Sequence, residues 1–148
     1  MWDAIFQAAT EVLIGATVGA AVGYGVGYGL AVIVKALSRA FAKLWENLVA
    51  VAKEIFGYIK EATQHYLALV AQFLDNNWSE IESQLRAKLG YSADWIIAIF
   101  QEGRDAFLQI AHPSTYQSQS LIFSLGIAED QTQLPSQQNP IVTRLSLS

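Results

Sequence analysis

Residues 12–34 read VLIGATVGAAVGYGVGYGLAVIV, an apolar run of 23 positions without a charged side chain. At a rise of about 1.5 Å per residue, an α-helix of this length is long enough to cross the roughly 30 Å hydrocarbon layer of a bilayer. Charged residues lie on both sides, because Glu11 precedes the run and Lys35 follows it. The run therefore predicts a transmembrane helix.

The same run has two other interpretations, a signal peptide and a buried helix of a soluble bundle. A signal peptide needs a basic segment before a shorter apolar core, whereas the charged residues before the run are Asp3 and Glu11. The buried helix stays open as an alternative, although each of the run's glycines costs it about 1 kcal/mol relative to alanine. A soluble resting form and an inserted form are compatible as two states of one molecule.

Small residues recur every fourth position of the run, the spacing that lets helix backbones approach closely in lipid. Two such ladders are offset by two positions, which places them nearly opposite each other on a helix. Two opposed small faces favour a ring or array in which each copy contacts two neighbours, with Tyr24 and Tyr28 facing the interior. The predicted contact residues are Gly15, Gly19, Gly23 and Gly27 on one ladder and Thr17, Ala21, Gly25 and Gly29 on the other.

Charge supports a membrane location and predicts its orientation. Charged residues make up 15% of the chain, whereas about 25% is usual in soluble domains. The basic residues Lys35, Arg39 and Lys43 follow the run, whereas the charged residues before it are all acidic. Because basic flanks stay in the cytoplasm, we expect a single-span protein with its N-terminus outside, its C-terminal part cytoplasmic, and membrane lipid as a partner.

After the run, apolar residues recur at intervals of three and four, which predicts amphipathic helices packed as a small bundle. Gly57 is a weak point at which the longest of these helices would bend. Asp75-Asn76-Asn77 is expected to end that helix and to cap the next. The expected helices span residues 36–74, 78–89 and 93–111.

A polar segment rich in Gln, Ser and Thr follows, interrupted by two short apolar, β-prone stretches at 121–127 and 141–147. One interpretation is a disordered tail. The other is a segment that adds to a sheet edge or stacks between chains, and so binds a protein partner. The predicted assembly residues are Leu121, Ile122, Phe123, Leu125 and Ile127.

These segments together predict an all-α fold in three parts. Residues 1–35 would form the glycine-zipper transmembrane helix, residues 36–112 the amphipathic bundle with one long and two shorter helices, and residues 113–148 the polar C-terminal tail.

No catalytic, cofactor-binding or metal site is indicated by the sequence. Cysteine is absent, which excludes disulfides and thiolate sites. His65 and His112 lie far apart without Asp or Glu at ligand spacing. The net charge of −4 without a basic cluster argues against a nucleic-acid partner. We therefore expect a non-enzymatic protein.

The layout of a glycine-zipper helix, a helical body and a polar tail with a β-prone motif resembles the HeLo-like and bacterial Bell-domain executioner proteins. The resemblance rests on the first glycine ladder and on residues 121–127. It implies that the tail is an amyloid-type signalling motif and that the zipper helix inserts to permeabilise a membrane.

The expected function is therefore a homo-oligomeric membrane pore formed through the glycine zipper. A non-enzymatic structural subunit of a large membrane or phage injection-type assembly is the alternative. A peripheral protein that only coats membranes is a third hypothesis.

Overall fold

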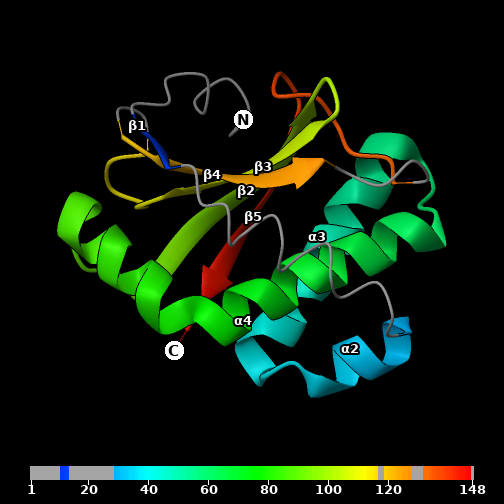
Figure 1. The fold of residues 1–148 in the computed structure, drawn as a ribbon, viewed down its shortest axis with the longest axis horizontal. Helices are drawn as coiled ribbons and strands as arrows, with labels where there is room; N and C mark the ends of the chain where they lie inside the picture. Colours follow the sequence, from blue (N-terminus) through cyan, green and yellow to red (C-terminus); the bar gives the residue numbers. More distant parts are fainter. Residues whose placement is uncertain (1–10, 14–28, 117–118, 128–131, 148) are drawn as a thin grey trace.

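The computed structural model describes residues 11–13, 29–116, 119–127 and 132–147. Within these ranges the chain has an α+β fold, in which helices pack on one side of a five-stranded sheet (Figure 1). The helices are α2 (Leu30–Ala36), α3 (Arg39–Phe56) and α4 (Glu61–Leu89). The strands are β1 (Glu11–Leu13), β2 (Asp94–Glu102), β3 (Asp105–Ala111), β4 (Leu121–Ile127) and β5 (Ile141–Ser146).

The strand order across the sheet is β1-β4-β3-β2-β5. Strands β2 to β5 pair antiparallel, and β5 returns to lie beside β2, as in a Greek key. Strand β1 pairs in parallel with the first half of β4. A tight turn joins β2 to β3, where Gly103 has a φ of 62° and Glu102 is opposite Asp105.

The helices are arranged around α4, which is the central helix of the domain. Six consecutive residues of α4, from Tyr66 to Ala71, are buried. A helix that is apolar on all sides must be surrounded by other elements. Helices α2 and α3 contact α4, and α2 lies on the side of α4 away from the sheet (Figure 1). The sheet face turned toward the helices is called the inner face, and the opposite one the outer face.

Apolar side chains from the inner face and the helices form one continuous core. Trp95, Ile97 and Ile99 of β2 pack in the same cluster as Leu48 and Leu74 of the helices, and each is at most 1% exposed. Complete burial of one such side chain contributes about 1.5–3 kcal/mol. This core holds the sheet against the helices.

The predicted all-α fold is wrong, and the expected helix over 93–111 is the β2–β3 hairpin. Residues Trp95–Phe100 are all buried, so β2 has apolar residues on both faces and does not alternate apolar with polar. Such a run cannot be told from a buried helix by periodicity alone. Gly103, which allows the turn, was the signal for a hairpin.

The other helix boundaries also differ from the prediction. The expected helix over 36–74 is divided where Gly57 adopts a left-handed conformation with φ 78° and ends α3. Helix α4 then continues through Asp75-Asn76-Asn77 without interruption. The Asp75 carboxylate instead accepts hydrogen bonds from the backbone N–H (2.8 Å) and hydroxyl (3.1 Å) of Ser38, the residue before α3.

The prediction of a single-span, pore-forming membrane protein is wrong. No helix within the described ranges combines the length and the apolar character needed to cross a membrane. Both ends of the expected span have another structure, since Glu11–Leu13 is strand β1 and α2 has only seven residues. The pore, the alternative membrane-assembly subunit and the N-out, C-cytoplasmic orientation are therefore not retained. Most of the predicted ladder lies outside the described residues, namely Gly15, Thr17, Gly19, Ala21, Gly23, Gly25 and Gly27, and so do Tyr24 and Tyr28. The remaining ladder residue, Gly29, is exposed and directly precedes α2.

The chain also does not end in a separate polar tail. Its two β-prone stretches are strands β4 and β5, which lie on opposite sides of the β2–β3 hairpin in the same sheet. Their backbone groups pair with β3 and β2 of the same chain. This pairing is physically favourable because buried backbone N–H and C=O groups need partners.

Candidate functional site

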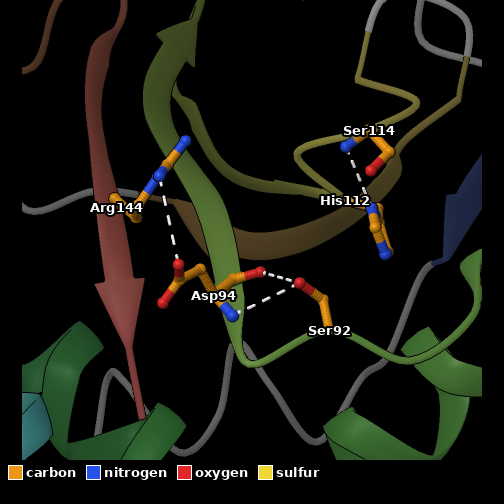
Figure 2. A network of polar contacts seen from close by, with 5 residues as sticks. All are labelled: Ser92, Asp94, His112, Ser114 and Arg144. Atoms are coloured by element: carbon orange, nitrogen blue, oxygen red, sulfur yellow. Dashed lines mark hydrogen bonds and ion pairs between the residues drawn. The ribbon is translucent and has the colours of Figure 1, made fainter. Parts of the chain in front are cut away.

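A cluster of polar residues lies at the end of the sheet opposite the β2–β3 turn (Figure 2). Nδ1 of His112 accepts the backbone N–H of Ser114 at 3.0 Å. Because Nδ1 accepts, Nε2 is the protonated nitrogen, and it donates to the Tyr91 carbonyl at 2.8 Å. The Trp95 ring meets the imidazole edge-on, with centroids 5.6 Å apart. The Nε2 bond thus joins the end of β3 to the segment before β2, and the Nδ1 bond holds the turn that follows β3.

The remaining members of this cluster do not complete a catalytic relay. The Ser92 hydroxyl donates to the Asp94 carbonyl at 2.5 Å, and the Asp94 carboxylate lies 4.0 Å from Arg144. Figure 2 shows the Ser92 side chain bonded to Asp94 and not to His112. A nucleophilic serine would need a base within hydrogen-bond reach. The cluster therefore joins strand ends and has no nucleophile–base pair.

A metal centre is also not indicated in the part of the chain that the structure describes. No group of three or more His, Cys, Asp or Glu side chains there is placed to hold an ion.

At the opposite end of the sheet, at the β2–β3 turn, the described residues line two hollows. Residues 132–137, which lead from β4 to β5, run between them and are fixed at several points. The Thr63 hydroxyl of α4 accepts the Gln133 N–H at 2.9 Å and donates to its carbonyl at 3.3 Å. The Gln101 N–H of β2 donates to the Pro135 carbonyl at 2.8 Å. This end of the sheet, with the turn and residues 132–137, is called the hairpin end.

The first hollow of the hairpin end is polar and has a volume of about 490 Å³. Amide and hydroxyl groups dominate its described lining, in which Lys60 is the only charged residue. Such a lining is readily satisfied by water. The lining residues are Lys60, Gln101, Gly103, Thr132, Gln133, Leu134 and Ser136.

The second hollow is apolar, has a volume of about 220 Å³, and lies on the outer face of the sheet. Phe100 and Phe107 are directly paired across β2 and β3, and their rings stack with centroids 5.4 Å apart. Ile122 of β4 adds a third apolar wall. Glu102 and Gln137 complete the lining, and the Gln137 N–H donates to the Glu102 carboxylate at 3.2 Å.

Beside the apolar hollow lies the last row of paired residues in the sheet. Glu102 is paired with Asp105, which is paired in turn with Ile127. Paired residues share a sheet face, and so do residues two positions apart on a strand without a bulge, as Asp105 and Phe107 are on β3. The bulge in β4 between Ser124 and Gly126 interrupts this alternation, so Leu125 faces the inner core although Ile127 does not. Ile127 is therefore on the same face as Phe107 and the apolar hollow. Its side chain is 68% exposed, an unusual position for a large aliphatic residue.

The predicted assembly residues of 121–127 are thus divided by the structure. Leu121, Phe123 and Leu125 belong to the inner core and are at most 4% exposed. Ile122 lines the apolar hollow and Ile127 lies exposed beside it.

Sequence reasoning missed the aromatic pair of the apolar hollow. A hairpin closed at Gly103-Arg104 would have placed Phe100 opposite Phe107, as the structure does. A helix over the same residues does not predict this pairing.

No protein-family model, curated protein or solved structure matches the chain. The resemblance to HeLo-like and Bell-domain proteins therefore stays a prediction.

Proposed function

We propose that this chain is a non-enzymatic self-association domain in which two copies contact each other through the hairpin end. The observation that supports the proposal is an apolar hollow with a strongly exposed isoleucine next to it on the same sheet face. Such a surface has both a projection and a recess that fits it.

A symmetric pair of copies would use both features at once. In a two-fold dimer the same patch of each copy contacts the other, so Ile127 of one copy can enter the hollow of the second while the reverse contact forms. The volume is sufficient, because the apolar hollow has about 220 Å³ and a cavity of about 150 Å³ is enough for benzene. Phe107, which is half-buried in the single chain, would then bury its remaining apolar surface against the walls that the already buried Phe100 and Ile122 provide.

The charges at the turn alternate in sign and are also self-complementary. Glu102, Arg104 and Asp105 are all exposed. A two-fold contact brings the arginine of one copy toward the carboxylates of the other. Exposed ion pairs add little affinity, typically about 0–1 kcal/mol. Their main effect is to select one orientation of the two copies.

Association through the sheet edges is less favourable than association through this face. The edge strand β5 has the exposed, charged Arg144 in its middle, and charge on an edge opposes strand addition. On the other side, β1 covers the first half of β4, and the second half contains a bulge where Gly126 has a φ of 81°. A bulge bends an edge away from regular pairing.

The test is sedimentation equilibrium of the full chain and of Ile127→Lys. Burial of an isoleucine contributes about 1.5–3 kcal/mol, and the symmetry doubles the loss, so the dimer dissociation constant should rise at least about 100-fold. The matched control is Tyr91→Lys, since Tyr91 is 69% exposed but lies before β2, at the other end of the sheet.

A dimer that weakens in Ile127→Lys and persists in Tyr91→Lys supports the proposal. A chain that stays monomeric at millimolar concentration, or an Ile127→Lys variant that dimerises as well as the unmodified chain, refutes it.

A further inference from the structure

We infer that the solvent-exposed surface of helices α2 and α3 is a docking site for an anionic lipid bilayer. This inference is independent of self-association through the hairpin end. The surface is called the basic face and is defined by Val32, Lys35, Ala36, Arg39 and Lys43, all at positions that are exposed or partly exposed.

The charge of the chain is unevenly distributed. Residues 30–60 contain five basic side chains (Lys35, Arg39, Lys43, Lys53 and Lys60) and two acidic ones (Glu46 and Glu54), a net charge of +3. Since the whole chain has a net charge of −4, the remainder has −7. All seven of these side chains are exposed. The helices at the start of the fold are therefore positive on a protein that is otherwise acidic.

Few of these basic side chains form ion pairs with other described residues. The ion pair formed there within α3 joins Lys43 to Glu46 at 3.8 Å, with side chains 71% and 62% exposed. A pair so open to water contributes little. Lys35 and Arg39 lie on either side of Ser38, which the Asp75 carboxylate holds through two hydrogen bonds. The junction that presents these two cations is thus fixed to α4.

An exposed aliphatic residue lies one helix turn before Lys35 on α2. Val32 is 59% exposed, whereas its neighbour Ile33 is 1% exposed and packs in the core. Helix α2 is therefore anchored, and the exposure of Val32 is not the result of a detached helix. Val32, Lys35 and Ala36 are three and four residues apart and share one side of α2.

The combination of aliphatic and basic side chains distinguishes between anionic partners. A nucleic acid binds through phosphate contacts and base edges and gains little from an aliphatic side chain beside them. A bilayer takes up apolar groups at its interface and attracts Lys and Arg to its anionic headgroups. Because α2 lies on the side of α4 away from the sheet, nothing of the sheet separates it from a flat surface (Figure 1).

The experiment is co-sedimentation of the full chain with phosphatidylcholine vesicles that contain or lack phosphatidylglycerol. One basic residue at an anionic surface changes binding by a factor of about five. The double variant Lys35→Glu with Arg39→Glu should therefore bind phosphatidylglycerol vesicles at least about 25-fold more weakly. The matched control is Arg86→Glu with Lys88→Glu, which makes the same change of charge at the end of α4. Circular dichroism checks that both variants fold.

Binding that requires phosphatidylglycerol, weakens in salt, and is lost in the Lys35/Arg39 variant but not in the control supports the inference. Equal binding to both kinds of vesicle, equal loss in the two double variants, or binding to polyuridylic acid without binding to phosphatidylglycerol vesicles overturns it. Sedimentation equilibrium on the same samples reports self-association separately, so either proposal can fail alone.

Discussion

Replacing Asp75 with alanine removes the acceptor that α4 provides for the start of α3. Ser38, the residue before α3, forms no capping hydrogen bond with its own side chain. Its backbone N–H and hydroxyl instead donate to the Asp75 carboxylate at 2.8 and 3.1 Å. Loss of a helix cap costs about 0.5–2 kcal/mol, and hydrogen bonds to a charged group contribute about 1.5–3 kcal/mol. Because these bonds are open to solvent, we expect a loss of about 1–2 kcal/mol.

The assay is urea denaturation followed by circular dichroism, with thermal unfolding as a second measurement. For a chain of this size, 1–2 kcal/mol corresponds to a fall in Tm of about 3–8 °C. Asn76→Ala is the matched control, since Asn76 is the adjacent exposed residue of α4. In a double-mutant cycle, Ser38→Ala should cost little once Asp75 is replaced. An Asp75→Ala variant as stable as Asn76→Ala would refute this account of the α2–α3 junction.

Three further substitutions test the core and the hairpin end by the same urea assay. Gly103→Ala should lower the free energy of unfolding by about 1–2 kcal/mol, because alanine is strained at the φ of 62° of this turn. Gly29→Ala should be nearly neutral, since the φ of Gly29 is −69° and no atom lies within 4 Å of the added Cβ. Equal effects of the two substitutions would contradict this. Thr63→Val should cost about 1–3 kcal/mol, since it leaves both backbone groups of Gln133 unpaired, and an unchanged stability would show that water replaces the hydroxyl. Leu48→Ala should cost about 2–5 kcal/mol because Leu48 is fully buried, and a loss below 1 kcal/mol would contradict the packing of α3.

The sequence contained much of the information about the helices but little about the sheet. Apolar residues of α3 at 41, 44, 48 and 52 are buried at the intervals that predicted an amphipathic helix. By contrast, β2 contacts partners that are distant in sequence, because β5 begins 47 residues after Asp94. Periodicity reports only the burial of each position and not its partner. A strand buried on both faces therefore appeared as a helix.

The N-terminal run shows the same limit for function. Its length and lack of charge predicted a bilayer span, yet Leu13 is paired with Phe123 in the sheet and α2 begins only at Leu30. Hydropathy does not distinguish a segment that enters a bilayer from one whose ends, like Leu13 and Ile33 here, belong to a sheet and to a protein core. Of the candidate site, Ile122 and Ile127 were within the predicted assembly segment, whereas Phe100 and Phe107 required the hairpin pairing.

The two proposed surfaces lie on opposite sides of the sheet, and this has a consequence for membranes. The apolar hollow is on the outer face, and the basic face belongs to helices on the inner side (Figure 1). If the two-fold contact at the hairpin ends brings the outer faces of the two copies together, as entry of Ile127 into the apolar hollow requires, the two basic faces point away from each other. One flat bilayer then contacts one basic face, and the other is free for a second bilayer.

Such a dimer should connect separate phosphatidylglycerol vesicles, which turbidity or dynamic light scattering would record as clustering. Ile127→Lys should abolish clustering but keep vesicle binding, because its basic face is intact. The Lys35→Glu, Arg39→Glu variant should lose both. Clustering that persists in monomeric Ile127→Lys would show that a single copy contacts two bilayers, and that the two surfaces are not arranged back to back.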